Sequence, residues 1–176
     1  GTAVVGLFTT FGASIKQSIN DTVSENFSGD LVILPEGFSG AMLSPDLPGA
    51  IAELPEVSSA VGAAFSPALI DEDTVEVTGT QVSALGEVFD IGLTDGTFDG
   101  FGDGDLAVSE KYADDHDLSL GSVVPMAFAD GTTSDLTIAA SYEDRMTFGD
   151  LIVTDDELAR HVAQGSLTVV LVDLVA

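Results

Sequence analysis

The sequence contains no cysteine and very little positive charge. The absence of cysteine excludes disulfides, thiol redox chemistry and cysteine-based zinc sites, although it does not define the cellular compartment. Only 4 lysines and arginines stand against 30 aspartates and glutamates, which gives a formal net charge of −26. Because so acidic a surface repels phosphate groups, we expect no nucleic-acid partner. The acidic excess is typical of a soluble surface and would also suit a salt-adapted source.

Long hydrophobic runs are also missing, since no stretch reaches the roughly 18 consecutive apolar residues of a membrane span. The beginning comes nearest, because GTAVVGLFTTFGASIKQSIN carries no charge before Lys16. Its apolar residues recur at helical spacing, at Val4, Phe8, Phe11, Ile15 and Ile19. This pattern predicts a helix over residues 1–28. The helix is either the end of a membrane helix emerging into water, with residues 1–15 poorly anchored, or an ordinary packed helix.

The composition is that of a folded domain, because 45% of the residues are hydrophobic. A chain of 176 residues suffices for one domain or two small lobes without a stabilising metal. The sequence does not begin with Met, and we therefore expect a fragment or a processed form.

The first part of the chain predicts a β-α-β unit. A strand at residues 31–34 is followed by a helix, for which Ser44 is a suitable N-cap and Pro45 a suitable first residue. Pro55 ends this helix, and VSSAVGAAFSPALI then predicts a long strand at residues 57–70.

The same order returns near the other end. A strand at residues 151–154 leads into a helix with a capping box, in which Thr154 is the cap and Glu157 lies three residues later. A last strand is predicted at residues 167–174. Two such units can form one sheet, so we predict an α+β fold with a split β-α-β (ferredoxin-like) lobe at residues 29–72 plus 147–176.

The middle of the chain, residues 73–146, has a different pattern and predicts a small β-rich lobe inserted between the two halves. Ser109 is placed to cap a short helix that begins at Glu110. Asp130-Gly131 is a strong hairpin signal between two strands. Pro125 inside the first of these strands favours an edge position or a bulge.

The phrase Gly-Asp-Leu occurs at the start of three predicted strands. We interpret its aspartates as structural, satisfying backbone amides where each strand begins; they are Asp30, Asp105 and Asp150.

No motif for chemistry is specific. His116 and His161 each end a predicted helix, a common structural position, and the nucleophile elbow of hydrolases is absent. There is no phosphate-binding loop. The stretch from Asp99 to Glu110 has the length of a calcium loop, with Asp103 well placed, but Phe101 stands where an oxygen ligand is needed. We predict a flexible acidic loop there and a solvated turn at residues 71–76, with no catalytic, cofactor or metal residues.

Several large apolar side chains lie in predicted loops, where they either contact a partner or fold back over the core. They are Phe38, Met42, Leu43, Phe98 and Phe101.

The order of five segments resembles a known family. These segments are FSGDLVILP, LSPDLPGAIAELPEVSSAVG, VEVTGTQVSALGEVFDI, GDLAVSEKYADDHDLSLGSVV and GDLIVTDDELARHV. Together they resemble the extracytoplasmic, MacB-like periplasmic core domain of MacB/FtsX-type ABC transporter permeases, over essentially the whole chain.

The resemblance implies a non-catalytic domain on the outer side of a cell membrane, with flanking membrane helices outside this fragment. It implies a second permease protomer and a cytoplasmic ATPase as partners, and an extracytoplasmic substrate or partner protein. It implies no cofactor. The alternative is a stand-alone secreted module that binds a ligand or a protein.

Overall fold

The computed structural model describes residues 31–33, 43–88, 91–143, 148–162 and 167–175. The predicted N-terminal helix, Asp30, Phe38 and Met42 therefore lie outside the described residues. The elements up to the middle of the chain are β1 (Leu31–Ile33), α2 (Leu47–Ala52), β2 (Val57–Ile70), β3 (Asp73–Thr80), α3 (Val82–Val88) and β4 (Leu93–Gly96). The others are β5 (Asp105–Ser109), α4 (Glu110–Asp115), β6 (Val123–Phe128), β7 (Thr133–Tyr142), β8 (Leu151–Thr154), α5 (Asp155–Ala159) and β9 (Val169–Leu174).

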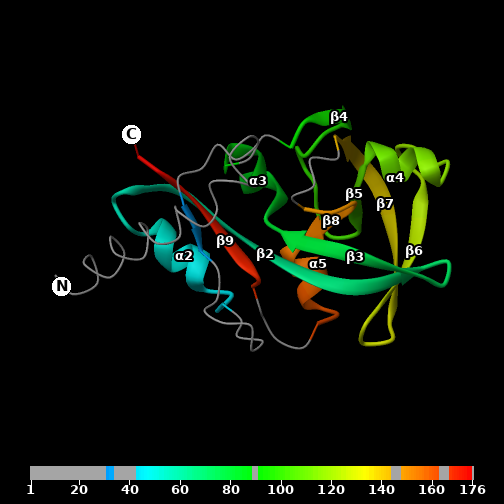
Figure 1. Ribbon diagram of the computed structural model, residues 1–176, viewed down its shortest axis with the longest axis horizontal. Coiled ribbons are helices and arrows are strands. Elements are labelled where there is room, and N and C mark those ends of the chain that lie inside the picture. Colours follow the sequence, from blue (N-terminus) through cyan, green and yellow to red (C-terminus); the bar gives the residue numbers. More distant parts are fainter. Residues whose placement is uncertain (1–30, 34–42, 89–90, 144–147, 163–166, 176) are drawn as a thin grey trace.

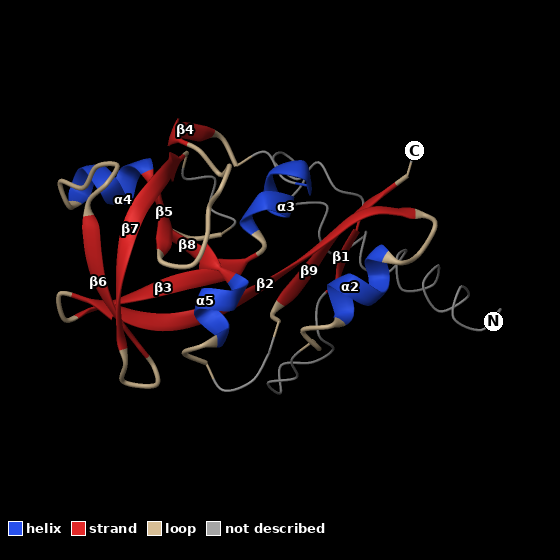
Figure 2. Ribbon diagram, turned by 180° about the vertical axis from the view of Figure 1, so that it is seen from behind, coloured by secondary structure: helices blue, strands red, loops and turns tan. Residues whose placement is uncertain are grey.

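The fold is a mixed α/β structure dominated by one sheet of nine described strands, with short helices beside it (Figure 2). Its longest strand is β2, which crosses most of the length of the molecule (Figure 1). The first half of β2 pairs with β9, which also pairs with β1. The second half pairs with β3, so β2 belongs to both ends of the sheet.

At the end of the sheet opposite β1 and β9, the strands pair in a closed ring. Starting from β2, the pairing runs through β3, β8, β5, β7 and β6 and returns to β2 at Ala68 and Leu69. We call these strands the strand ring. Its interior is filled by buried side chains that include Val77, Leu106, Met126, Leu136 and Leu151. Burying such side chains stabilises the fold by about 1.5–3 kcal/mol each.

Alternating residues of β2 face two further apolar clusters. Ala60 packs on the face covered by α2, together with Ile51 and Val170. Val61 packs on the opposite face, where Val82 and Leu85 of α3 lie. The period of two along a strand therefore places α2 and α3 on opposite faces of the sheet.

The ferredoxin-like arrangement is not confirmed. The strands β1 and β2 do run parallel with β9 between them, since each is antiparallel to β9. However, β3 lies between β2 and β8, where the ferredoxin-like plan would leave no place for it. The reason is local: the two-residue turn at Asp71 and Glu72, both with positive φ, folds β3 directly back onto β2. The proposed division at residues 29–72, 73–146 and 147–176 remains a prediction.

Most of the local predictions are confirmed. The strand at Val57–Ile70 has the predicted bounds, and β1 and β8 belong to one sheet. The Thr154 hydroxyl accepts a 3.0 Å hydrogen bond from the Glu157 amide, which confirms the cap. The reciprocal half of the capping box is not seen among the described residues, because the Glu157 carboxylate contacts Arg160 and His161 instead. Asp130-Gly131 joins β6 to β7, and Pro125 lies outside the short stretch where β6 pairs with β2.

The predicted start of the helix between β1 and β2 is wrong by two residues. Helix α2 begins at Leu47 with Asp46 as its N-cap, and Pro48 lies in its first turn. Ser44 instead begins a turn, in which its hydroxyl accepts a hydrogen bond from the Asp46 amide and its carbonyl accepts one from the Leu47 amide. Pro45 therefore belongs to that turn and not to the helix.

Candidate functional site

The repeated Gly-Asp-Leu phrase has a structural role at both of its described positions. The Asp105 carboxylate accepts a 2.9 Å hydrogen bond from the Gly102 amide, as predicted. For Asp150 the prediction is not confirmed within the described residues, where its carboxylate accepts a 2.6 Å hydrogen bond from the Ser109 hydroxyl and none from a backbone amide.

Ser109 is in turn the N-cap of α4, as predicted, and its hydroxyl accepts a hydrogen bond from the Tyr112 amide. One hydroxyl thus joins the helix, β5 and the residue that precedes β8. Burial raises the pKa of the Tyr112 phenol, and the neighbouring carboxylates of Asp150, Asp71 and Asp73 raise it further.

The acidic loop is held by its own neighbours. Asp103 accepts a 2.9 Å hydrogen bond from the Thr154 hydroxyl and pairs with the Arg160 guanidinium. No group of three or more histidine or carboxylate residues within the described ranges is arranged to hold a metal ion. Asp103 therefore anchors the loop to α5.

The two histidines have different environments. His116 is exposed at the C-terminal end of α4 and its ring lies against Tyr112, with centroids 4.2 Å apart. The His161 side chain is only 10% exposed. Its ring stacks on Phe128 with centroids 4.0 Å apart and an interplanar angle of 4°.

Polar groups surround both ring nitrogens of His161. Its Nδ1 lies 2.7 Å from the Thr132 hydroxyl and 3.4 Å from an Asp130 carboxylate oxygen. Its Nε2 lies 3.1 Å from the Ser134 hydroxyl and 3.3 Å from Glu157 Oε1. We call these residues, together with Phe128, the His161 cluster. It ties the end of α5 to the β6–β7 hairpin.

The cluster brings a serine, a histidine and an aspartate together, but its geometry fits a structural role better than a catalytic one. Ser134 lies within the β6–β7 ladder, opposite Met126, and not on an exposed turn as in a nucleophile elbow. The Nε2 atom that would act as a base also faces Glu157, and the Thr132 hydroxyl is the nearest neighbour of Nδ1. We assign no catalytic residue.

The two carboxylates of the His161 cluster have different environments, because Asp130 is exposed and Glu157 is buried. Hydrogen bonds from the Thr132 hydroxyl and amide lower the pKa of the exposed Asp130 carboxyl, and His161 lowers it further. Glu157 is almost completely buried, and its carboxylate forms an ion pair with Arg160 at 3.0 Å and lies 3.3 Å from His161 Nε2. Arg160 therefore joins the His161 cluster to Asp103 of the acidic loop.

Three of the apolar loop residues fold back over the core. Phe98 and Phe101 meet edge to face, with centroids 5.8 Å apart, and both pack against the cluster on the α3 face. Leu43 exchanges backbone hydrogen bonds with Leu167 and packs on the α2 face. The sequence left open whether these side chains contact a partner or fold back over the core. The structure favours the second interpretation for these three residues.

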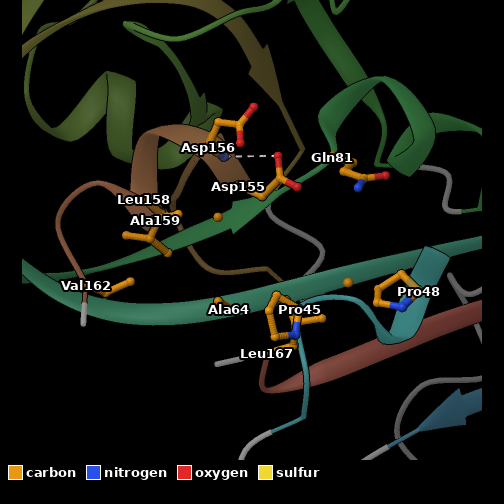
Figure 3. A pocket seen from close by; sticks show the side chains of 12 residues that line it. Pro45, Pro48, Ala64, Gln81, Asp155, Asp156, Leu158, Ala159, Val162 and Leu167 are labelled. Atoms are coloured by element: carbon orange, nitrogen blue, oxygen red, sulfur yellow. Dashed lines mark hydrogen bonds between the residues drawn. The ribbon is translucent and has the colours of Figure 1, made fainter. Parts of the chain in front are cut away.

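The local sequence patterns gave no sign of a cavity of about 150 Å³ between α2 and α5 (Figure 3). Gly62 and Gly79 form its floor, and Pro45, Pro48, Ala64 and Leu158 contribute apolar walls. Gln81 and the first residues of α5, Asp155 and Asp156, line its polar side. We call this the α2–α5 cavity.

Both floor glycines permit close packing around the cavity. A Cβ atom at Gly79 would lie 2.6 Å from Leu158 Cβ, and one at Gly62 would lie 2.6 Å from a Leu167 methyl carbon. Only the absence of a side chain lets α5 and Leu167 approach the sheet this closely. A glycine within a strand often marks such a close approach, but it does not by itself indicate a cavity.

The family model for the MacB-like periplasmic core domain matches residues 1–175. The chain belongs to this family. No curated protein sequence matches it.

Two solved structures show the same fold. The periplasmic region of MacB from Actinobacillus actinomycetemcomitans is 11% identical with a TM-score of 0.59, over 92% of this chain and 79% of that one. The extracellular domain of the noncanonic ABC-type transporter YknZ from Gram-positive bacteria is 15% identical with a TM-score of 0.61, over 82% of each chain. Within the described ranges, no helix is long and apolar enough to cross a membrane.

Proposed function

We propose that this domain works outside the membrane as the non-catalytic part of an ABC transporter permease. It couples ATP-driven movement of membrane helices to the export or release of a substrate, or to a partner protein. The family assignment supports the transporter context. The observation that carries the coupling role is the adjacency of the first and last described strands.

That adjacency is set by the register of the sheet. Leu31 at the start of β1 lies opposite Val172, two residues before the end of β9 at Leu174. Leu174 in turn lies opposite Val57, the first residue of β2. Membrane helices joined before β1 and after β9 would therefore act on the same edge of the sheet, and on β2 with it.

The strand β2 then provides a route for this movement. It pairs continuously from β9 to β3 and reaches β6 at its far end (Figure 1). Close-packed interiors deform little, so a displacement of the β1–β9 edge should tilt the whole domain. The proposed partners are a second permease protomer and a cytoplasmic ATPase.

The test uses the full-length permease, assembled with its ATPase in lipid nanodiscs. The described domain has no cysteine, so one spin label placed at the exposed Asp135 of each protomer reports the distance between the two far ends. We expect this distance to change between the nucleotide-free and ATP-bound states. An unchanged distance during active ATP hydrolysis would refute coupling.

The α2–α5 cavity favours a second candidate, a stand-alone secreted binding module without a transport role. Reading the full-length coding sequence separates the two. Membrane-spanning segments in the same chain support the permease, and a signal peptide followed by this domain alone supports the binding module.

A further inference from the structure

We propose that the α2–α5 cavity binds one apolar side chain of a peptide or protein, with a neighbouring lysine or arginine held by the acidic start of α5. This inference deepens the proposed function, because it names the chemistry of a segment that the domain would recognise outside the membrane.

The size of the cavity limits what can enter. Its volume is about 150 Å³. An apolar cavity of about 150 Å³ can hold a molecule the size of benzene, whereas whole ligands require roughly 300–1,000 Å³. A single phenyl or isobutyl group therefore matches the space, and the remainder of its chain would stay on the surface.

The walls suit such a group. The floor is made of strand backbone at Gly62 and Gly79, and the sides are ring and methyl carbons of Pro48, Ala64, Leu158 and Leu167. Figure 3 shows these side chains arranged between α5 and the start of α2. Since the lining offers few polar partners on this side, a polar occupant would lose hydrogen bonds on entering.

The opposite side selects for positive charge. Asp155 and Asp156 line the cavity, and no lysine, arginine or histidine in the described residues forms an ion pair with either carboxylate. Gln81 adds a side-chain amide there. In a chain of net charge −26, an anionic segment would be repelled and a cationic one attracted.

The experiment is a titration of the isolated domain, followed by amide NMR shifts, with three capped peptides that differ at one position. They are Gly-Phe-Lys-Gly, Gly-Phe-Gln-Gly and Gly-Phe-Glu-Gly. We expect the lysine peptide to shift the amides of Gly79, Gln81 and Asp155, and to bind about threefold more tightly than the glutamine peptide. The glutamate peptide should bind most weakly.

Two variants locate the binding. Ala64→Phe fills the cavity from β2 and should abolish the shifts. Ala159→Phe fills it from α5 and provides the same test if the first variant does not fold. The matched control is Ala52→Phe, an exposed alanine of α2 that does not line the cavity and should leave binding unchanged. Asp155→Asn should remove the preference for lysine, whereas Asp114→Asn on α4 should keep it.

Three outcomes would overturn the proposal. They are shifts spread over the whole acidic surface, binding that survives both filling variants, and equal affinity for the lysine and glutamine peptides. Because the assay contains no membrane or ATPase, its failure leaves the coupling role untouched. Conversely, a failed coupling experiment would leave this site to be tested as that of a secreted binding module.

Discussion

The Ser109 hydroxyl donates a 2.6 Å hydrogen bond to the carboxylate of Asp150, 41 residues further along the chain. The same hydroxyl accepts from the Tyr112 amide, so it is both the cap of α4 and the link from β5 to the residue before β8. Replacing it leaves both groups without this partner.

Ser109→Ala should therefore lower the free energy of unfolding by about 1–2 kcal/mol, because it removes a cap and a charge-assisted hydrogen bond. Urea denaturation followed by circular dichroism measures the change. Ser58→Ala, an exposed serine of β2, is the control and should have almost no effect. A Ser109 variant as stable as the control would show that the link contributes nothing.

The two histidines provide a matched pair. His161→Ala removes the stacking on Phe128 and leaves the buried Glu157 carboxylate with one partner fewer, so we expect a loss of about 2–3 kcal/mol. His116→Ala at the exposed end of α4 should cost less than about 1 kcal/mol. Equal losses in urea denaturation would argue against a special role for the His161 cluster.

The lowered pKa of Asp130 predicts that the stability of the fold decreases at acidic pH. Its pKa lies below the ordinary 3.8 in the folded chain, mainly because Thr132 donates hydrogen bonds to the carboxylate. Because the pKa of Asp130 is lower in the folded chain than in the unfolded chain, the ionised carboxylate stabilises the fold at any pH above its unfolded-state pKa. This stabilisation is lost as the pH falls through the folded-state pKa. Melting temperatures measured from about pH 5 downwards should fall less steeply for Asp130→Asn than for the unmodified chain. Parallel curves would contradict this.

Gly79, one of the two glycines at the floor of the α2–α5 cavity, should be intolerant of substitution. A Cβ at Gly79 would meet Leu158 Cβ at 2.6 Å, so Gly79→Ala should push α5 outwards and destabilise the fold by about 1–3 kcal/mol. Gly49 in α2 has nothing within 4 Å of an added Cβ. Gly49→Ala should instead be neutral or stabilise by up to about 1 kcal/mol, because alanine favours helix. Thermal denaturation distinguishes the two directions of change.

Local structure was largely predictable because its causes are local. The full extent of β2, the Ser109 and Thr154 caps and the turn at Asp130-Gly131 depend on residues within a few positions of one another. The late start of α2 was missed because the turn at Ser44 satisfies the same local rules as a helix cap.

Long-range pairing was harder to predict, for a physical reason. The hydrophobic pattern of β3 does not say which strands it pairs with, and its place between β2 and β8 is set by contacts with residues far away in the chain. Apart from Glu157, the neighbours of His161 come from a hairpin 27 to 33 residues earlier in the chain, so no spacing rule indicates the cluster. The α2–α5 cavity depends on how two helices approach the same strand and has no pattern of its own.

In the proposed mechanism, β2 makes the β1–β9 edge and the strand ring one rigid body. Spin labels at the exposed Ser58 and Asp135 of a single protomer in the full-length permease test this rigidity, because they lie at the two ends of the sheet. We predict the same narrow distance distribution without nucleotide and with ATP. A distribution that shifts or broadens when ATP binds would show that the domain bends within itself and does not transmit movement as one rigid body.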